Sequence, residues 1–436
     1  GMESKAFWQA KIWGLLHDSP LKSLQKSKDG CGPWNSLRVM EGWQKSNHIG
    51  KADTVASSSD RAAIGAMDGW SNVNYDNGLK LRHLLSGKES HFELPSSSHL
   101  HEWRNLSNSE EKKSIKQLVR DTIPETIRES EDPKEVFWYL WRYLPEALSR
   151  HPDINNPSLL LTPAETRIPD CSIWSHNSMT AALSGCLAGY DGADNSRPHI
   201  VTFTFTPVQE MVKHSRKMQD FWAGSWLLHY LSASICWAWA EEFGPDSLVY
   251  PSLYAQPLID RWLLAKYPNF ESLHDQEVIQ APKIRQLLTA GFPNVLVIIV
   301  PEVKVKAAID KARRVLTGED PQVRSPWMEI AKQVKQNVFG NEIIDPRTWE
   351  SWLSSQWQTY WTAIPLGDKS QELSNPKEEK FEEWKKKQNE LATLPDKNCL
   401  FTIEEGSFFN RLWKVNVGSW WAPLFDRVRL NLTAVK

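Results

Sequence analysis

The chain has 436 residues, which at roughly 100–200 residues per domain predicts two to four domains and a core that needs no disulfide or metal. Its 51 Lys and Arg residues almost balance 53 Asp and Glu residues, so the net charge of −2 excludes a generally basic coat for nucleic acid. None of the five cysteines forms a C-x-x-C pair, which argues against a disulfide framework or a zinc ribbon and favours a reducing cytoplasm.

Residues 1–195 are predicted to be mainly helical. Apolar residues at helical spacing, among them Phe7, Ile12 and Leu15, lead into His17-Asp18, and Pro20 should end or kink that helix. Three further helical segments are expected at 51–67, at 109–150 with breaks near Pro124 and Pro133, and at 173–187. The polar stretch 86–98 is predicted to be a loop, and residues 252–293 a partly helical insert.

A period-two pattern begins near His199, where Val201, Phe203 and Phe205 alternate with threonines and predict a strand. Thr206 is expected to cap a helix that runs from Pro207 to about Glu242. The following elements are predicted as strands at 247–250, 295–300 and 360–366 and a helix at 304–315.

The order β-α-β-β-α-β is that of a ferredoxin-like split unit. We therefore predict an α+β chain with a helical domain over 1–195 and a ferredoxin-like domain with a helical insert over 196–366. A charged and then Trp-rich region is predicted over 367–436.

The stretch Phe221–Ala240 contains no Asp, Glu, Lys or Arg, and about 20 such residues are long enough to cross a bilayer. It also carries His229 and several serines and continues a charged helical run, so we predict a buried core helix and no membrane association. The first residues contain no apolar stretch, so no signal peptide is expected.

Adjacent His17 and Asp18 near a helix end are able to ligate one divalent metal, although a capped helix end is the commoner explanation of such a pair. Asp53 lies on the next predicted helix and His176 on a later one, so two His and two Asp from three helices are candidates for one site. Imidazole and carboxylate together suit Mn, Fe, Co, Ni or Zn, and a metal there would activate water for phosphodiester hydrolysis. The alternative for His176 is a hydrogen-bonded core histidine. His274-Asp275 is a second such pair and is predicted to lie in a surface loop.

Several stretches resemble one family, the large subunit of type III CRISPR effector complexes of the Cmr type (III-B). They are KIWGLLHDSPLKSL (11–24), KADTVASSSDR (51–61), TPAETRIPDCSIWSHNSMTAALSGCLAG (162–189), FTFTPVQEMVKHSRKMQDFWAGSWLLHYL (203–231) and DSLVYPSLYAQPLIDRWL (246–263). The resemblance implies an N-terminal, circularly permuted HD domain with metal-dependent nuclease activity on single-stranded DNA. The family's metal and catalytic residues fall on His17, Asp18, Asp53 and His176. Mn, Co, Ni or Mg is the expected cofactor.

Two positions depart from the family pattern. Ser175 stands where the family commonly has Asp, and Cys171 where many members have His. Loss of groups that orient metal ligands weakens metal binding, so the alternative is a degenerate HD domain that serves as a scaffold for assembly and nucleotide binding. A phosphohydrolase acting on small nucleotides is a third possibility, which the long matching stretches argue against.

The resemblance also implies that the second domain is the first of two Palm domains, polymerase- and cyclase-like folds that make cyclic oligoadenylate from ATP. The Gly-Gly-Asp-Asp motif of the second Palm is absent, so we expect that Palm beyond residue 436 and no cyclase activity from this chain alone. One wall of the ATP site is assigned to a set of residues that offer close backbone approach or polar groups: Gln209, Ser215, Arg216, Asp220, Gly224 and Ser225. Tight packing of a helix on a sheet is the alternative reason for Gly224-Ser225.

Two further patterns have competing explanations. A basic group is suited either to RNA phosphate or to a solvated helix face, which its acidic neighbours favour; it comprises Lys304, Lys306, Lys311, Arg313, Arg314 and Arg324. Five early tryptophans are suited to base stacking or, as their helical spacing favours, to core filling; they are Trp8, Trp13, Trp34, Trp43 and Trp70. The expected partners are other Cmr subunits, CRISPR guide RNA and target RNA, with single-stranded DNA as substrate.

Overall fold

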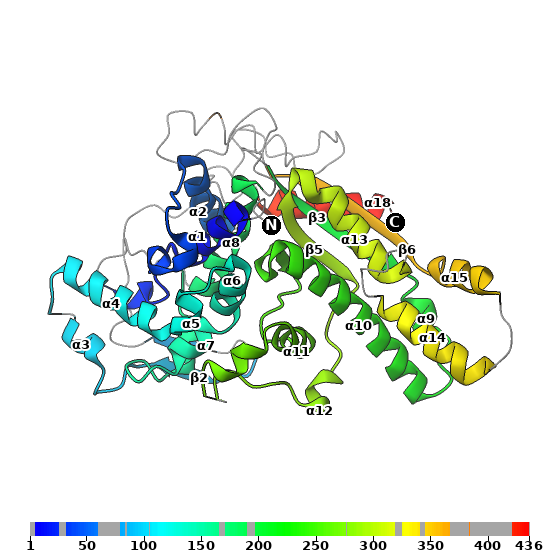
Figure 1. Cartoon of the computed structure of the whole chain (residues 1–436), viewed down its shortest axis with the longest axis horizontal. Coiled ribbons are helices and arrows are strands. Elements are labelled where there is room, and N and C mark those ends of the chain that lie inside the picture. The colour runs from blue at the N-terminus through cyan, green and yellow to red at the C-terminus, as the bar shows by residue number, and fades with distance from the viewer. Residues whose placement is uncertain are drawn as a thin grey trace. The chain divides into compact units, whose positions relative to one another are not determined.

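The computed structural model describes residues 5–25, 32–59, 79–82, 85–103, 105–164, 171–189, 197–275, 277–318, 325–340, 345–366, 383 and 421–435. The chain forms two compact units (Figure 1). The first contains Gly1–Arg197, Asn269–Gln280 and Gly367–Arg427, and the second Pro198–Pro268, Ala281–Leu366 and Val428–Lys436. The predicted domain limits at 195/196 and 366/367 stay a prediction.

The first unit is mainly helical, as predicted. Its helices are α1 (Lys5–Leu16), α2 (Asn47–Ser59), α3 (His99–Trp103), α4 (Asn108–Thr122), α5 (Glu125–Arg128), α6 (Pro133–Arg142), α7 (Leu144–Ser149) and α8 (Ile173–Ala188). Helix α2 begins four residues before its predicted start, and residues 60–67 of that prediction lie outside the described residues. The predicted breaks near Pro124 and Pro133 are confirmed, because each proline lies at the start of a helix.

A two-stranded antiparallel hairpin also belongs to this unit, formed by β1 (Leu79–Arg82) and β2 (Glu89–Phe92). The prediction of a loop over 86–98 is therefore wrong at 89–92. The local sequence is polar, but backbone pairing with β1 supplies the strand, and Phe92 at its end is buried.

Helix α1 lies in the core of the first unit, with ten of its twelve residues buried, and packs against α6 and α8. Trp8 and Trp13 are both buried, which confirms core filling for these two residues. Trp34 and Trp43 are half-buried and pack edge to face at 5.6 Å between ring centroids. Trp70 lies outside the described residues.

The short segment 269–280 joins this unit through side chains of α6. The Tyr139 hydroxyl lies 2.6 Å from His274 Nε2, and the two rings stack. Asn269 Nδ2 donates to Glu135 Oε1 at 2.9 Å. His274 is therefore half-buried and bonded, so the prediction of a surface loop pair at His274-Asp275 is wrong for the histidine.

The second unit is built on a four-stranded antiparallel sheet with the order β4-β5-β3-β6. The strands are β3 (Pro198–Thr206), β4 (Leu248–Tyr250), β5 (Val295–Pro301) and β6 (Gln358–Pro365). In the central strand, Thr202 pairs with Val297 on one side and Thr362 on the other. The main elements follow the chain as β3-α10-β4-β5-α13-β6, which confirms the predicted β-α-β-β-α-β order.

Helices α10 (Met218–Phe243) and α13 (Val305–Thr317) run side by side along this sheet (Figure 1). Trp239 of α10 meets Phe203 of β3 edge to face at 5.8 Å, and its Nε1 donates to the Ala308 carbonyl of α13 at 2.8 Å. One aromatic side chain thus ties both helices to the sheet. Other helices of this unit are α9 (Gln209–Lys213), α11 (Pro257–Lys266), α12 (Ile284–Leu287), α14 (Pro326–Phe339) and α15 (Pro346–Ser354).

The prediction of one helix from Pro207, capped by Thr206, is wrong. Thr206 is the last residue of β3 and pairs with Gln358, and the helical region is split into α9 and α10. Lys217 is extended, with φ −133° and ψ 160°, and the Asp220 carboxylate accepts from the Arg216 N–H at 3.3 Å. That local bond gives the backbone an alternative to a continuous helix.

Helix α10 ends at Gly244, as predicted, with φ 94° at that residue. The prediction of a buried core helix is confirmed for the second half of the charge-free stretch, because Leu231, Ile235 and Trp239 are fully buried. Its first turns are exposed, including Met218 and Trp222. Within the described part of the chain, no helix combines the length and apolar character that a membrane span requires.

The region predicted over 367–398 lies outside the described residues except for Glu383. In the last segment the structure describes one helix, α18 (Trp421–Val435).

Candidate metal centre

The four residues predicted as metal ligands meet at one place in the first unit. His17 and Asp18 directly follow the last residue of α1, Asp53 lies on α2, and His176 lies on the first turns of α8. One ligand atom from each residue lies within 4.8 Å of the corresponding atom of every other. Segments separated by more than 100 residues thus converge on a volume the size of one cation.

The imidazoles face the carboxylates through their Nε2 atoms. His17 Nε2 lies 3.3 Å from Asp53 Oδ1 and 3.7 Å from Asp18 Oδ2. His176 Nε2 lies at the same two distances, 3.3 Å and 3.7 Å, from the same two atoms. The two rings are 5.4 Å apart between centroids. This near-symmetric arrangement directs two imidazole nitrogens and two carboxylate oxygens inward.

The tautomer of His17 is fixed by the helix that precedes it. His17 Nδ1 lies 2.7 Å from the Gly14 carbonyl, to which it donates, so the neutral ring presents a lone pair at Nε2. That Nε2 is buried and makes no hydrogen bond within the described part of the chain. An orphaned buried nitrogen is costly, and a metal ion would supply its missing partner. The donor set fits a first-row divalent metal.

Asp18 is held by two further groups. Lys22, in the 3₁₀ helix Lys22–Leu24, donates from Nζ to Asp18 Oδ2 at 2.6 Å. The buried Asn177 donates from Nδ2 to the Asp18 backbone carbonyl at 3.3 Å. Lys22 therefore binds the same carboxylate oxygen that faces both histidines.

Asp53 differs from the other three residues in its exposure, because 45% of its side chain is accessible whereas the others are buried. Desolvation opposes ionisation of this carboxyl. When His17 and His176 carry a proton on Nε2, their charges and hydrogen bonds outweigh that effect and hold the pKa of Asp53 well below its usual range. Asp53 is thus the most exposed member of the cluster.

Close packing of α1 on α8 sets the spacing of the cluster. A Cβ on Gly14 would lie 2.7 Å from the Ala181 Cα of α8, so only glycine allows this approach. Gly32 N donates to the Leu16 carbonyl at 2.7 Å and fixes the chain where α1 ends. His176 is positioned by the N-terminus of α8, which is capped by the Ser172 side chain.

The two departures from the family pattern lie beside the cluster and outside its ligand set. Ser175 is exposed and its hydroxyl accepts from the Ser172 hydroxyl at 3.1 Å, so it continues the helix cap. Cys171 is half-buried, and its sulfur lies 3.5 Å from the Ser172 carbonyl. The four converging residues do not include it.

The residues predicted for an ATP site occupy a different environment in the second unit. Gln209 begins α9, Ser215 and Arg216 lie in the turn that follows, and the other three lie in the first two turns of α10. Gln209, Arg216 and Asp220 are exposed, and Ser215, Gly224 and Ser225 are half-buried. A Cβ on Gly224 would lie 3.8 Å from the nearest atom, the Met211 carbonyl oxygen, so close packing does not require glycine there.

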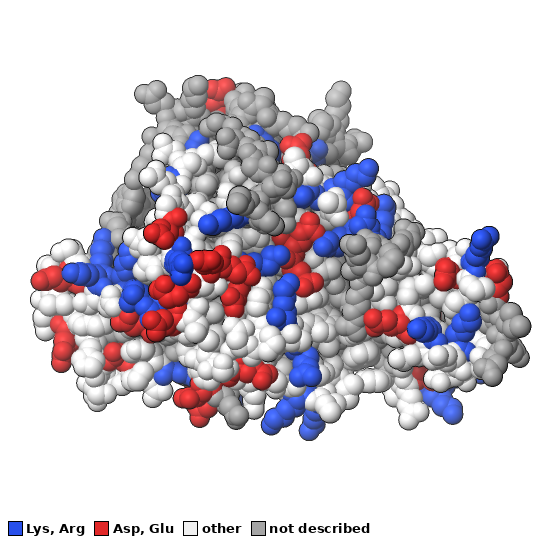
Figure 2. Space-filling view, viewed as in Figure 1, with Lys and Arg blue, Asp and Glu red and all other residues white. Residues whose placement is uncertain are grey.

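The basic residues near α13 are largely engaged within the chain. Lys311 pairs with Glu242 at 2.7 Å, and Arg313 donates to the Thr359 hydroxyl at 3.0 Å. On the face shown in Figure 2, Lys and Arg side chains over α13 are interspersed with Asp and Glu side chains. This mixture favours the solvated helix face over a phosphate-binding strip. Arg324 lies outside the described residues.

Lys22 and Asn177, which hold Asp18, were not anticipated from the sequence. Lys22 stands four residues after Asp18, the spacing at which oppositely charged side chains meet in a helix, and that signal was available. Asn177 directly follows His176, but nothing local indicates that its amide reaches a carbonyl 159 residues earlier in the chain.

Comparison with known proteins finds sequence similarity to one family in the second unit, outside the four converging residues. Residues 200–338 match the family described as CRISPR-associated protein Cmr2, N-terminal. The Cmr subunit Cmr2 of Pyrococcus furiosus is 33% identical over 138 residues, which cover 32% of this chain and 13% of that protein. Cmr2 of Saccharolobus solfataricus is 29% identical over 105 residues, which cover 24% of this chain and 10% of the relative.

Among solved structures, a chain of the type III-B Cmr-beta complex in its apo state aligns with a TM-score of 0.50 and 16% identity. The alignment covers 88% of this chain and 40% of the other, so this chain spans well under two thirds of the proteins it matches. At that identity the likeness concerns the fold alone. Taken with the sequence matches, it confirms the resemblance of this chain to the large subunit of type III-B Cmr CRISPR complexes.

Proposed function

We propose that this chain is part of the large subunit of a type III-B CRISPR effector complex and that its helical unit is a metal-dependent nuclease for single-stranded DNA. The observation that carries the proposal is the convergence of His17, Asp18, Asp53 and His176 within 4.8 Å. The resemblance to Cmr2 supports the biological setting, and the donor set supports the chemistry.

The residues of the chain have separable roles in this proposal. His17 and His176 present nitrogen donors, and Asp18 and Asp53 supply negative charge. A bound Mn, Co, Ni or Mg ion would lower the pKa of a coordinated water toward neutrality and so provide a nucleophile for a phosphodiester. The Gly14 carbonyl keeps the His17 proton on Nδ1, and the exposed edge at Asp53 leaves room for a strand.

The second unit, in this proposal, is the first Palm and contributes one wall of an ATP site through Gln209, Ser215, Arg216, Asp220, Gly224 and Ser225. Their position at the exposed start of α10 is compatible with a second Palm closing the site from outside this chain. Other Cmr subunits, guide RNA and target RNA are the proposed partners, and the cytoplasm the proposed location.

Cleavage of labelled single-stranded DNA, with Mn, Co, Ni or Mg added separately, tests the nuclease. The variants are wild type, H17A/D18A and, as a matched control, H214A, which removes a histidine whose side chain is 83% exposed. We expect metal-dependent cutting that H17A/D18A abolishes and H214A preserves. Cutting that survives H17A/D18A would exclude this cluster as the active site.

A non-catalytic scaffold is the second candidate, and the Lys22–Asp18 ion pair together with Ser175 favours it. Lys22 occupies one carboxylate oxygen of the cluster, and Ser175 offers no carboxylate beside His176. Elemental analysis of purified protein separates the two functions: the nuclease requires near-stoichiometric metal that H17A/D18A loses. Absence of both metal binding and cutting would leave the scaffold.

A further inference from the structure

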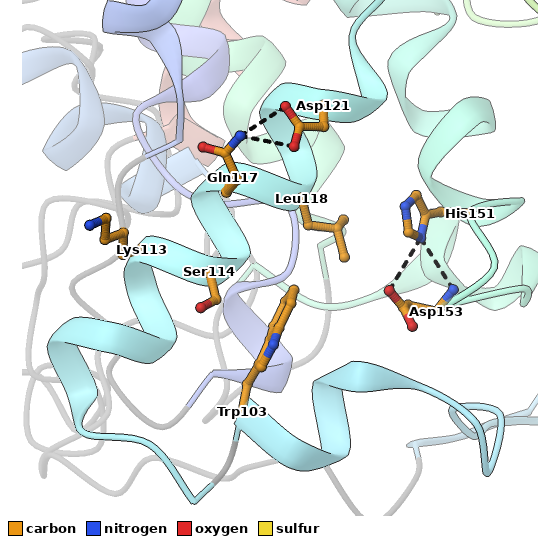
Figure 3. Close-up of a pocket in the computed structure, with 8 residues that line it drawn as sticks. All are labelled: Trp103, Lys113, Ser114, Gln117, Leu118, Asp121, His151 and Asp153. Atoms are coloured by element: carbon orange, nitrogen blue, oxygen red, sulfur yellow. Dashed lines mark hydrogen bonds and ion pairs between the residues drawn. The ribbon is translucent and has the colours of Figure 1, made fainter.

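The first unit contains a hollow with a volume of about 410 Å³, and none of the four metal-site residues lines it. Residues on one face of α4, the last residue of α3 and the turn after α7 line it (Figure 3). That volume falls in the range of small-ligand sites. None of the features considered above involves these residues.

One side of the cleft is apolar. The Trp103 indole of α3 and the Leu118 side chain of α4 stand on the same side, opposite His151 and Asp153 (Figure 3). Leu118 is buried and Trp103 is half-buried, so the indole keeps part of its surface open. An aromatic face beside an aliphatic side chain is a platform for a flat ring.

The opposite side offers a matched donor and acceptor. His151 Nδ1 accepts from the Asp153 N–H at 3.2 Å, so the neutral ring carries its proton on Nε2. Burial lowers the pKa of His151, an effect that Asp153 opposes and His99 reinforces, which keeps the ring neutral at physiological pH.

One carboxylate oxygen of Asp153 is already hydrogen-bonded within the chain. Its Oδ1 accepts from His99 N at 2.9 Å and lies 3.0 Å from His99 Nδ1. The other oxygen, Oδ2, lies 3.8 Å from His151 Nδ1, beyond hydrogen-bond distance. A carboxylate oxygen that is able to accept from an N–H or O–H donor is therefore held opposite the indole.

The rim adds a cation. Lys113, on α4, is exposed and pairs with no acidic group among the described residues, whereas Gln117 and Asp121 beside it bond to each other at 2.9 Å. These side chains together match a ligand with a flat ring, N–H donors and acceptors on the ring edge, and an attached anionic group. We propose that the cleft binds a nucleotide, with its base against Trp103, the base edge on His151 and Asp153, and its phosphate near Lys113.

The nucleotide has two sources, a free nucleoside monophosphate or one residue of a single strand. Isothermal titration calorimetry of the full 436-residue chain in EDTA, which removes any metal-dependent binding or cutting, uses the four nucleoside monophosphates, the four nucleosides and six-residue single strands. The variants are W103A and S114F, which adds bulk at the cleft from a half-exposed helix position, and K113A. K116A on the same helix lies outside the lining and is the matched control.

We expect saturable binding that W103A weakens by about five- to 150-fold, the range that loss of one base-stacking partner produces. S114F should also weaken binding. K113A should weaken the binding of monophosphates more than that of nucleosides, and K116A should leave the binding of both unchanged. If the single strand binds more tightly than the monophosphate, the natural ligand of the cleft is a residue of a strand. If the strand binds equally or more weakly, the natural ligand is a free nucleotide.

Two results would overturn the proposal: no binding of any of these probes at about 1 mM, which corresponds to about −4.1 kcal/mol, or binding that W103A and S114F both leave intact. The second result would place nucleotide binding elsewhere, as at the proposed Palm site. Since the assay needs neither metal nor cleavage, its failure leaves the nuclease proposal standing, and failure of the nuclease test leaves this one standing.

Discussion

The two predicted functional sites contrast in how they are held. The metal centre lies where α1, α2 and α8 pack together, three of its four residues are buried, and its ligand atoms converge. The proposed ATP-site residues lie along α9 and the exposed start of α10. The four candidate ligands are therefore positioned by packing within this chain. The proposed ATP-site residues lie on the surface, so their arrangement as a binding site would depend on a partner that covers them.

The largest expected effect separates the two sites by metal affinity. H176A should weaken binding of Mn²⁺ by more than about 100-fold, because loss of an outer partner alone costs 10–100-fold and His176 is a direct ligand in our proposal. R216A/D220A should leave that affinity unchanged. Equilibrium dialysis measures both, and equal losses in the two variants would contradict the contrast.

Glycine substitutions compare the packing of the two regions. G14A places a Cβ 2.7 Å from the Ala181 Cα, and such overpacking should lower the free energy of unfolding by about 1–3 kcal/mol. G224A meets nothing closer than 3.8 Å and should raise it by about 0.5–1 kcal/mol, the usual gain of alanine over glycine within a helix. Urea unfolding followed by circular dichroism gives both values. A stabilising G14A would show that α1 and α8 are not in contact as described.

The Lys22–Asp18 pair offers a smaller test. K22M removes a cation that competes for Asp18 Oδ2, so affinity for Mn²⁺ should rise by about two- to fivefold, the value of a modest ion pair. K213M removes a lysine that pairs with Glu210 on α9 and should have no effect. A fall in affinity with K22M would mean that Lys22 supports the metal site.

The smallest effect concerns the buried part of α10. His229 Nδ1 accepts from the N–H groups of Gly291 and Phe292, both at 2.9 Å, and burial lowers the pKa of His229 from its ordinary 6.5. The unfolded chain therefore binds this proton first. The contribution of neutral His229 to the free energy of unfolding is therefore present above about pH 6.5 and is lost as the pH falls below that value.

Unfolding free energies at pH 7.5 and 5.5 test this, with H229N as the comparison because its side-chain oxygen retains an acceptor that does not titrate. The decrease in stability between the two pH values should be smaller in H229N. An equal decrease would assign the pH dependence to other groups.

Elements with a strong local period were predictable from the sequence. The alternation at Val201, Phe203 and Phe205 predicted β3, and the helical spacing around Phe7 predicted α1, because each repeat matches the geometry of one type of element. The gathering of His17, Asp18, Asp53 and His176 was anticipated from residue chemistry and family resemblance together. Spacing along the chain does not by itself specify a distance in space.

What could not be predicted depends on contacts that the hydrophobic pattern does not record. Strand β2 is polar and forms because β1 pairs with it, and the helix break at Lys217 depends on a side chain three residues later. The cleft unites Trp103 with His151 and Asp153, which share no local motif. Such juxtapositions arise from packing and leave no periodic trace in the sequence.

The attachment of residues 269–280 to the helical unit has a practical consequence for dissecting the protein. Phe270 is fully buried and packs against Tyr139 and Tyr143, yet the residues on either side of this segment belong to the sheet unit. A fragment that stops at residue 195 would lack Phe270 and leave an apolar hollow beside α6. The two units are interlaced along the covalent chain, so neither can be cloned intact as one uninterrupted stretch.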